Sequence, residues 1–541
     1  MIARGARTIT RGRRLSTLMC RNSRAPPPPN SPHQGVALSR PRVPVFARGL
    51  ASAPPRLTTH YKAIANASPR DGLPLTELDD MDAAEVDRLA DLGRACVASS
   101  WSQRASVGRR VVVLHEIAAS IRSRSEELAR LETLDCGKSI AESRADIAFC
   151  AQIFDYYAAL APDALRERPL LNEPPFVAHV VPSAVGLVAC VTPWNYPLMQ
   201  ACVKVAPALA AGCAVLLKPS PLASLTCLEL GRIAAAVGAP TGALSVITGG
   251  PPSGAADGAS RLLSPESRVD KVSLTGSARA GTEALHQSAR ALRPTSLELG
   301  GKGAMIVFED ADMDSAVEWA LLGIFGNAGQ VCSATSRLLL HAPIAAEFTA
   351  RLVAAANAIV VGDPLLEETQ MGALISAERH ATVLDSIASA RIDGARVLCG
   401  GGTLSVPGCE GGWYVAPTIL AEVPFDSAAW CEEIFGPVLA LATFGTEREA
   451  VALANDSQFG LAHAVMTADA ARAERVADAL EAGTVWINCS QLVWPGTPFG
   501  GWKRSGFGRE FGEAGLEEYM RYKTVTRAPA GHACDSYAGR Q

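Results

Sequence analysis

The chain has 541 residues, 48% of them hydrophobic, so it can bury large cores and form two or more domains. The formal net charge is −4, and all acidic residues follow residue 70, so the body of the chain is acidic and a poor nucleic-acid binder. No apolar run approaches the roughly eighteen residues of a membrane helix, and we predict no membrane span. The fourteen cysteines and nine histidines lack ligand or pair spacing, so we predict no metal site and no disulfide framework.

The first seventy residues differ in composition from the rest of the chain. They hold twelve arginines, no acidic residue and the proline run Pro26–Pro29, which is typical of an organelle transit peptide. We predict a disordered transit peptide over residues 1–57, directed to the mitochondrial matrix, with the plastid stroma as the alternative. Removing residues 1–51 takes away ten arginines and lowers the net charge from −4 to −14. The competing interpretation is a basic tail that binds nucleic acid or anionic lipid.

The next segments predict helices and then a hairpin. A helix is expected to start at Asp82, and apolar residues at helical spacing predict one amphipathic helix over Val107–Thr133 and another over Ala145–Leu160. Proline, glutamate and alternating apolar residues over Pro162–Pro182 predict a projecting hairpin.

From Val185 onward, short apolar runs alternate with helical stretches. This alternation predicts an α/β fold with parallel sheets covered on both faces. A second alternating block runs from Ala304 to about Asn488. In the first block the predicted strands are Val185–Val191, Ala214–Leu217, Leu244–Thr248 and Lys271–Thr275, and the predicted helices are Leu198–Ala211, Leu222–Val237 and Ser277–Arg290.

Three segments combine reactive side chains with glycine or proline. Cys332 lies in Phe-Gly-Asn-Ala-Gly-Gln-Val-Cys-Ser-Ala (325–334), Glu298 lies in Leu-Glu-Leu-Gly-Gly-Lys (297–302), and Asn195 lies in Thr-Pro-Trp-Asn-Tyr-Pro (192–197). A thiol and a carboxylate, each beside glycines that let a ligand approach the backbone, indicate a nucleophile and a base. Taken alone, a cysteine is more often a small buried hydrophobic residue.

Together, in this order and spacing, these segments resemble the aldehyde dehydrogenase superfamily, and the resemblance runs from about Ala95 to Val525. It implies a Rossmann-like dinucleotide-binding domain, an α/β catalytic domain and a small β oligomerisation element. The expected ranges are 58–161 and 183–297 for the dinucleotide-binding domain, 298–503 for the catalytic domain, 162–182 and 519–527 for the oligomerisation element, and 528–541 for a C-terminal tail.

The resemblance also implies a reaction. Cys332 would attack an aldehyde, with the Asn195 amide and the Cys332 backbone N–H as donors to the oxyanion. Hydride loss would leave a thioester, and Glu298 would deprotonate the water that hydrolyses it. Lys204 and Glu510 match a pair thought to relay that proton. The presence of Glu298 favours release of a free acid over transfer to coenzyme A.

The implied cofactor is NAD, with NADP as the alternative. The strand and helix start over Lys271–Gly281 can present backbone N–H groups to a pyrophosphate. Lys218 matches a lysine that binds the adenosine ribose, and Glu433 and Phe435 match residues that hold the nicotinamide ribose and pack near its ring. The full set of predicted cofactor-binding residues is Thr192, Trp194, Lys218, Ser220, Gly249, Gly276, Ser277, Gly281, Leu299, Glu433 and Phe435.

Two departures from the family pattern concern this cofactor. Pro221 stands where NAD-preferring members often carry a glutamate, whose charge would repel a 2′-phosphate. Its absence predicts measurable use of NADP. The stretch Gly249–Asp270 is several residues longer than the family norm.

Other segments, such as 217–230 and 503–510, resemble the aminoaldehyde and betaine aldehyde dehydrogenases. In that group an aromatic box holds the cationic end of the substrate, each ring contributing about 0.5–2 kcal/mol. Two family tryptophans are replaced here, by Val203 and Gly326, so the box is thinner. The predicted substrate contacts are Tyr196, Val331, Trp494 as a replacement for a lost tryptophan, and Phe499 in place of a third tryptophan.

The sequence therefore predicts a hydrolytic aldehyde dehydrogenase with a small-molecule aldehyde substrate, forming a homodimer or homotetramer. Two alternatives remain open at this point. One is a coenzyme A-acylating semialdehyde dehydrogenase, which Glu298 disfavours. The other is a catalytically inactive binding protein of the same fold, which the intact Cys332, Glu298 and Asn195 disfavour.

Overall fold

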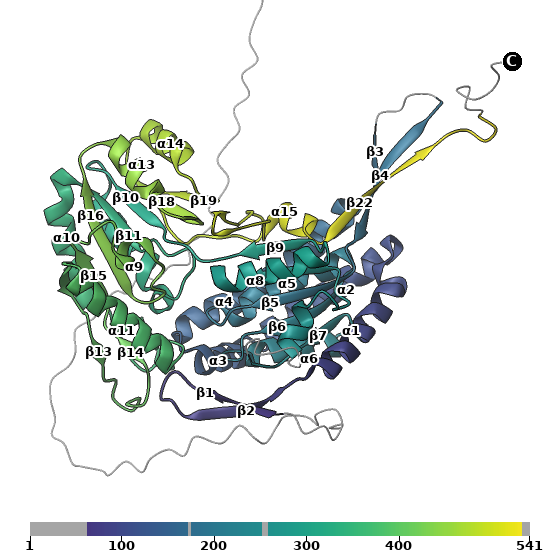
Figure 1. The fold of residues 1–541 in the computed structure, drawn as a ribbon, viewed down its shortest axis with the longest axis horizontal. Coiled ribbons are helices and arrows are strands. Elements are labelled where there is room, and N and C mark those ends of the chain that lie inside the picture. Colours follow the sequence, from purple (N-terminus) through teal and green to yellow (C-terminus); the bar gives the residue numbers. More distant parts are fainter. Residues whose placement is uncertain (1–61, 171–174, 251–257, 533–541) are drawn as a thin grey trace, which may run out of the picture. The chain divides into compact units, whose positions relative to one another are not determined.

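The structure is a computed structural model that describes residues 62–170, 175–250 and 258–532, all within one compact unit (Figure 1). The predicted transit peptide and the last nine residues of the predicted tail lie outside these ranges. Within them, no helix is both long enough and apolar enough to cross a bilayer.

The first lobe is built on a six-stranded sheet with the order β21-β9-β8-β5-β6-β7. Its four parallel pairings follow the predicted alternation, and all the parallel strands except β7 are largely buried, as expected for a sheet covered on both faces. The parallel strands are β5 (Leu187–Thr192), β6 (Ala214–Pro219), β7 (Leu244–Val246), β8 (Lys271–Thr275) and β9 (Thr295–Glu298); β21 (Gly506–Phe507) is antiparallel to β9; the intervening helices are α5 (Pro197–Ala211), α6 (Leu225–Ala236), α7 (Gly258–Leu263) and α8 (Ala278–Arg290).

The second lobe is built on a seven-stranded sheet with its own hydrophobic core. All its neighbouring pairs are parallel except the edge strand β12, which is antiparallel to β15. In sheet order the strands are β12 (Arg396–Cys399), β15 (Thr418–Ala421), β16 (Val438–Phe444), β11 (Arg337–His341), β10 (Ala304–Val307), β18 (Ala462–Met466) and β19 (Thr484–Ile487), and the covering helices include α9 (Met313–Phe325), α10 (Ala342–Asn357), α11 (Ala377–Ile392), α13 (Glu447–Asn455) and α14 (Ala470–Ala479).

The helices before the first sheet differ in part from the prediction. α1 (Ala83–Ala98) begins at the expected place, because the Asp82 side chain accepts a hydrogen bond from the Glu85 N–H. The single helix predicted over Val107–Thr133 is wrong: α2 (Val107–Ser123) and α3 (Ser125–Cys136) are separated at Arg124. The Ser123 hydroxyl donates to the Ser120 carbonyl at 2.9 Å, an example of a serine that competes with helical backbone bonding.

The long helix α4 (Ile140–Ala164) begins five residues before the prediction and ends four residues beyond it. Its start is fixed by a capping box, in which Ser139 and Glu142 exchange hydrogen bonds between side chain and backbone. Its end includes Pro162, so the hairpin predicted over Pro162–Pro182 begins too early.

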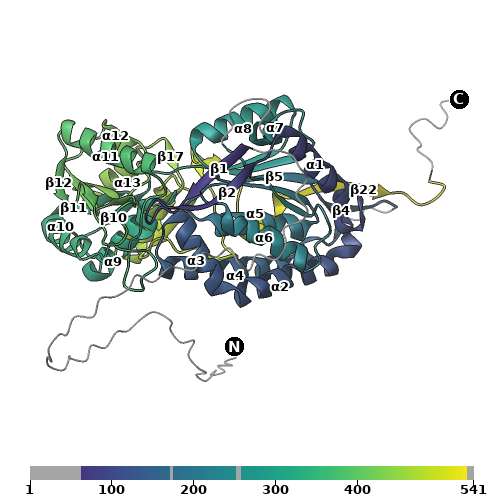
Figure 2. The ribbon, with the colours of Figure 1, turned by 90° about the horizontal axis from the view of Figure 1, so that it is seen from below.

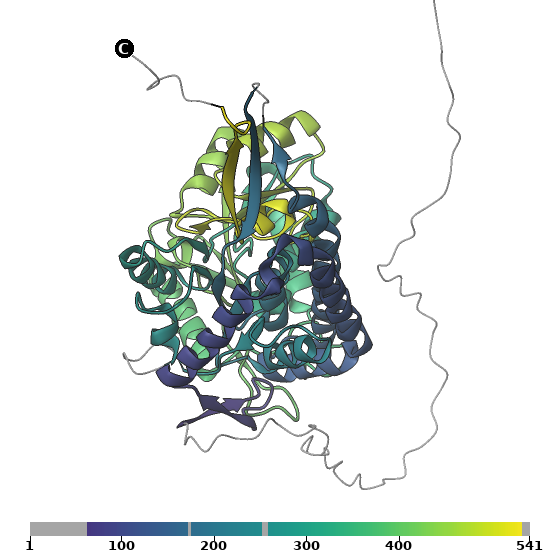
Figure 3. The same ribbon diagram turned by 90° about the vertical axis from the view of Figure 1, so that its right-hand side faces the viewer.

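A three-stranded sheet follows from the remainder of that segment. β4 (Val177–Ala184) pairs with β3 (Arg168–Pro169) on one side and with β22 (Met520–Arg527) on the other. The β22 pairing is antiparallel from Met520 opposite Ala184 to Arg527 opposite Val177, and Figure 3 shows β22 (yellow) beside β4 (blue).

An N-terminal hairpin, β1 (Lys62–Ala67) and β2 (Pro74–Asp80), was not recognised in the sequence. It contacts both lobes (Figure 2). The Asn66 amide donates to Asp135 of α3 at 2.9 Å, and Arg70 forms an ion pair with Asp363 of the second lobe at 2.7 Å. The hairpin therefore joins the two lobes on the side away from β22.

Candidate active site

The segments that carry Cys332 and Glu298 meet through their backbones. Cys332 follows a short 3-10 turn, η3 (Gly326–Gly329), which ends α9, and Glu298 is the last residue of β9. A Cβ added to Gly301 would lie 2.4 Å from the Cys332 carbonyl oxygen, so only glycine allows this approach. The structure thus brings together the two motifs that the sequence singled out.

Cys332 is half-buried beside several carboxylates. Burial raises the pKa of its thiol to about 12, and the negative charges of Glu433, Glu298 and Glu510 add to this rise. A thiol in this surrounding is mostly protonated at neutral pH, and it therefore needs a group that removes its proton before it attacks.

Glu298 is buried, and neither of its carboxylate oxygens has a hydrogen-bonding partner among the residues that the structure describes. Burial, and then the charge of Glu510, raise its pKa well above the usual value for a glutamate. A carboxylate with a raised pKa and free acceptor oxygens is suited to take a proton from a thiol or a water molecule.

Asn195 lies in the loop between β5 and α5 and contacts the cysteine loop directly. Its Nδ2 donates to the Gln330 carbonyl at 2.9 Å, and its own carbonyl accepts from Asn327 Nδ2 at 2.8 Å. Because an amide nitrogen carries two hydrogens, one N–H remains for a further acceptor. Asn195 therefore lies where it can donate toward a group bound at Cys332.

Lys204 and Glu510 form a buried ion pair with an N–O distance of 2.5 Å, and Lys204 also donates to the Ser273 hydroxyl at 3.1 Å. Glu510 comes from the segment after β21, and its backbone pairs with Phe499 through two hydrogen bonds of 2.8 Å. The charges of this pair act on Glu298: Glu510 raises the pKa of Glu298, and Lys204 lowers it.

Most of the predicted cofactor residues lie at or just beyond the carboxyl ends of the strands of the first sheet, where ligands of open α/β sheets bind, whereas Glu433 and Phe435 come from the second lobe. Lys218 near the end of β6 donates to the Gly249 carbonyl at 2.9 Å, while Ser220 lies in the turn that follows. Thr192 ends β5 and Thr275 ends β8, and both have buried hydroxyls without a hydrogen-bonding partner in the described ranges. Buried hydroxyls of this kind fit a ligand that supplies the missing partner.

Helix α8 begins directly after β8. Ser277 caps it by accepting from the Ala280 N–H at 3.2 Å, and Gly276 precedes it. The first-turn N–H groups have no acceptor within a helix and can bind an anion. Gly281 has a packing role as well, because an added Cβ would lie 2.7 Å from the Leu299 side chain.

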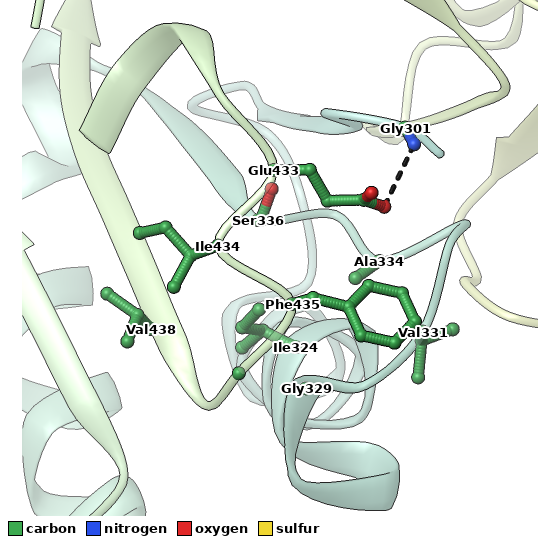
Figure 4. A pocket seen from close by; sticks show the side chains of 11 residues that line it. Gly301, Ile324, Gly329, Val331, Ala334, Ser336, Glu433, Ile434, Phe435 and Val438 are labelled. Carbon is green, nitrogen blue, oxygen red and sulfur yellow. Dashed lines mark hydrogen bonds between the residues drawn. The ribbon is translucent and has the colours of Figure 1, made fainter. Parts of the chain in front are cut away.

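A small pocket beside the cysteine loop contains Glu433, Phe435 and Val331 (Figure 4). The Glu433 carboxylate accepts from the Gly301 N–H at 3.0 Å, and burial raises its pKa to about 7. The Phe435 ring meets Trp194 edge to face, with 5.2 Å between ring centroids. The strand ends, α8 and this pocket together fit a dinucleotide that spans from β6 to the cysteine loop.

The predicted substrate residues are not all gathered at this site. Tyr196 is partly buried, and the Lys138 ammonium already lies 4.2 Å from the centre of its ring. Val203 is buried in the core of the first lobe. Trp494 is 56% exposed, so the structure does not place it as a replacement wall.

Sequence reasoning missed the polar contacts that hold the cysteine loop. Gln330 accepts from Asn195 through its carbonyl and from the Ile375 N–H through its side chain, and Glu142 accepts from the Asn327 N–H at 2.6 Å. The pattern Ser139-x-x-Glu142 was a signal for a helix start, but nothing in it indicates a contact 185 residues away.

Comparison with known proteins places these features in a family. The family model described as "Aldehyde dehydrogenase family" matches residues 57–525. The chain is 46% identical to aminoaldehyde dehydrogenase 1, peroxisomal, of Pisum sativum, covering 82% of this chain and 88% of that protein. It is 46% identical to betaine aldehyde dehydrogenase, chloroplastic, of Amaranthus hypochondriacus, covering 79% and 84%. A crystal structure of betaine aldehyde dehydrogenase from Staphylococcus aureus in complex with NAD+ matches with a TM-score of 0.84 and 35% identity, covering 88% and 94%.

These relatives contradict the predicted mitochondrial location. Two pea aminoaldehyde dehydrogenases are named peroxisomal and the amaranth protein is named chloroplastic, and none of these is mitochondrial. An arginine-rich, acid-free leader is common to mitochondrial and plastid transit peptides, so its composition could not separate the two.

The family model covers most of the chain, and the meeting of Cys332, Glu298 and Asn195 beside the ends of a parallel sheet agrees with it. The chain belongs to the aldehyde dehydrogenase family.

Proposed function

We propose that this protein oxidises an aldehyde to a carboxylic acid, with NAD as the hydride acceptor and water as the final nucleophile. The observation that carries the proposal is the backbone contact of Gly301 with Cys332. This contact joins the cysteine loop to the segment after Glu298, whose charge acts on the Cys332 thiol and whose carboxylate has no hydrogen-bonding partner among the described residues. Family membership supplies the reaction class, and the burial of both groups supplies the chemistry.

In the first stage, the Cys332 thiol gives its proton to a water molecule in the site, and its sulfur forms a bond to the aldehyde carbon. Negative charge moves onto the aldehyde oxygen, and the free N–H of the Asn195 amide and the Cys332 backbone N–H donate to it. A bound nicotinamide ring supplies a hydride acceptor. Loss of hydride from the substrate carbon leaves a thioester on Cys332.

In the second stage, Glu298 removes a proton from water, which attacks the thioester and releases the acid and the thiolate. The raised pKa of Glu298 favours this step, because a stronger base removes the proton more readily. The neighbouring Lys204–Glu510 pair would pass the proton onward.

For the cofactor, we propose that Lys218 binds the adenosine ribose and that the start of α8 at Ser277 binds the pyrophosphate. Glu433 would hold the nicotinamide ribose, with Phe435 packed beside the ring. The first lobe is then the dinucleotide-binding domain, and the second lobe supplies Cys332.

For the substrate, we propose an aldehyde of the betaine aldehyde or aminoaldehyde type, as in the names of the pea and amaranth relatives. The cationic end would have fewer aromatic contacts than a full box supplies, because Lys138 covers a face of Tyr196 and Trp494 is exposed. Because each ring contributes about 0.5–2 kcal/mol, we expect weaker selection for a quaternary ammonium group than in relatives with a complete box.

The test is a panel of aldehydes incubated with purified protein, with NADH and NADPH followed by absorbance and the products identified by mass spectrometry. We expect free acid as the product and no effect of added coenzyme A. A requirement for coenzyme A, or a thioester product, would contradict the proposal.

We also propose that β22 and β4 form the contact between copies of the chain. Their strands carry exposed side chains, including Val177 and Tyr522. Light scattering after size exclusion should give the mass of a dimer or tetramer, and Thr524→Pro in β22 should lower it by removing a backbone donor. An unchanged mass for the variant, or a monomeric wild type, would contradict this.

A further inference from the structure

Glu142 on α4 connects a helix start to the cysteine loop. Its Oε2 accepts from the Ser139 N–H at 3.1 Å and from the Ser139 hydroxyl at 2.9 Å. Its Oε1 accepts from the Asn327 N–H at 2.6 Å. One carboxylate therefore caps α4 and also holds the backbone of a turn five residues before Cys332.

That turn has an unfavourable backbone. Asn327, Ala328 and Gly329 have φ values of 47°, 52° and 71°, so three successive residues are left-handed and two of them are not glycine. Left-handed conformations of residues with a Cβ are costly and persist only where surrounding contacts hold them. The Asn327 carbonyl accepts from the Gln330 N–H and from Gln330 Nε2, both at 3.1 Å. Its N–H is held by Glu142 alone among the contacts that the structure describes.

The same turn sets the place of Asn195. Asn327 Nδ2 donates to the Asn195 carbonyl at 2.8 Å, and Asn195 Nδ2 donates to the Gln330 carbonyl at 2.9 Å. A shift of the turn would therefore move both the donor of the oxyanion site and the loop that leads to Cys332.

We propose that Glu142 is a positioning residue for the reaction: by binding the Asn327 N–H, it holds the left-handed turn in the geometry that aligns Cys332 with the Asn195 amide. This inference rests on the roles proposed above for those two residues. Glu142 itself does not contact the substrate.

The chain offers a matched control for this role. Ser139→Ala removes the hydrogen bonds of the Ser139 hydroxyl with the Glu142 carboxylate and the Glu142 N–H, which cap α4. It leaves the hydrogen bond between Glu142 and the Asn327 N–H. Glu142→Ala removes the hydrogen bonds of the carboxylate with both Ser139 and Asn327. If Glu142 served only to cap α4, the two variants would affect the enzyme alike.

The experiment measures kcat, KM for NAD and thermal stability for wild type, Ser139→Ala, Glu142→Ala and Glu142→Gln. The aldehyde is betaine aldehyde, or aminobutyraldehyde if wild type oxidises it faster. We expect Glu142→Ala to lower kcat by about 10²-fold, since small misplacements of reacting groups cost about that much. KM for NAD should change much less than kcat, because the hydrogen bonds that the structure gives the Glu142 carboxylate go to Ser139 and Asn327 and not to the residues proposed to hold the ribose and pyrophosphate. Ser139→Ala should keep a kcat near wild type while lowering the melting temperature.

Glu142→Gln is the rescue variant. Its amide oxygen can still accept from the Asn327 N–H, and its amide nitrogen can donate to the Ser139 hydroxyl. It should recover most of the lost kcat, which also keeps the test valid if Glu142→Ala does not fold. Wild-type kcat in Glu142→Ala, equal losses in Ser139→Ala and Glu142→Ala, or a kcat in Glu142→Gln reduced by 10²-fold would each overturn the proposal. Failure of the proposed function is a separate result, because it would appear as an active Cys332→Ser variant.

Discussion

The cysteine loop and the segment after β6 are both parts of the candidate site, but they are built in different ways. Around Cys332, backbone segments pack directly against each other. A Cβ added to Gly301 would lie 2.4 Å from the Cys332 carbonyl oxygen, and one added to Gly329 would lie 2.0 Å from the Gly436 carbonyl oxygen. After β6, a side chain makes the contacts, since Lys218 reaches the Gly249 carbonyl, and Pro221 is partly exposed.

This difference indicates that substitutions in the cysteine loop change the chemistry, whereas substitutions after β6 change the choice of cofactor. In the cysteine loop the backbone fixes the reacting atoms, so exchanging one reactive side chain should remove a chemical step without moving its neighbours. After β6 the backbone is less crowded, so a new side chain should change which cofactor binds without stopping the reaction. The predictions below test this contrast.

The largest loss of aldehyde oxidation is expected for Cys332→Ser. A serine hydroxyl is a far weaker nucleophile than a thiolate, so oxidation should fall by several orders of magnitude. NAD binding, followed by fluorescence titration, should be nearly unchanged, because the substitution replaces one atom of a half-buried side chain. Retention of more than about a tenth of the activity, roughly 1.4 kcal/mol of barrier, would show that Cys332 is not the nucleophile.

Glu298→Gln should lower steady turnover by about 10²–10⁴-fold, the range for loss of a general base. Rapid mixing should still give a burst of NADH, because acylation of Cys332 precedes the hydrolysis that Glu298 assists. Loss of the burst together with turnover would assign Glu298 to thiol activation instead.

The pH dependence supplies the control for this assignment. The base works only when ionised, and the pKa of Glu298 is raised well above its usual value by burial. Wild-type turnover should therefore fall as the pH drops through that raised pKa. The Glu298→Gln variant lacks the titrating group, and its turnover should lose this step of the profile.

Asn195→Ala should lower kcat by about 10²–10³-fold, the usual cost of one oxyanion donor. The variant also removes the hydrogen bond to the Gln330 carbonyl. Circular dichroism and NAD titration should show that the fold and cofactor site persist. A near-normal kcat would mean that the Cys332 backbone N–H is a sufficient donor.

Elements with a clear local apolar pattern could be predicted from the sequence, and elements without one could not. The strand predicted over Ala214–Leu217 was found to within two residues of β6, because buried parallel strands are continuous apolar runs. The break at Arg124 was missed, since the apolar spacing of α2 continues into α3 and only the serines around it indicate an end. The β1–β2 hairpin was missed because β2 is mostly exposed and carries charged residues, so it lacks an apolar strand pattern.

In the site, residues in glycine-rich motifs were found, whereas residues that act through distant contacts were not. Cys332 and Glu298 lie in local patterns that indicate their chemistry. Glu142 and Lys138 have no such pattern, because their partners Asn327 and Tyr196 come from other elements. The exposed position of Trp494 likewise depends on packing that the sequence does not encode locally.

The smallest effect is expected at residue 221, and it concerns the choice of cofactor. The Ser220 hydroxyl accepts from the Leu222 N–H at 3.3 Å and its carbonyl accepts from the Ala223 N–H at 3.3 Å, so Pro221 lies inside a turn. Proline has no N–H, and its replacement removes no hydrogen bond from this turn. We expect wild type to use NADP measurably, because no carboxylate at this position repels a 2′-phosphate.

Pro221→Glu should then raise the ratio of kcat/KM for NAD to that for NADP. A charged acceptor for the ribose hydroxyls contributes about 1–3 kcal/mol, so the ratio should change by roughly tenfold or more. Pro221→Ala is the control, since it frees the turn without adding a charge. If the alanine and glutamate variants lose activity with both cofactors equally, the proline serves to hold Lys218 in place. An unchanged ratio in Pro221→Glu would show that residue 221 does not contact the ribose. It would also contradict the contrast drawn above, because side chains in the segment after β6 would then not control the choice of cofactor.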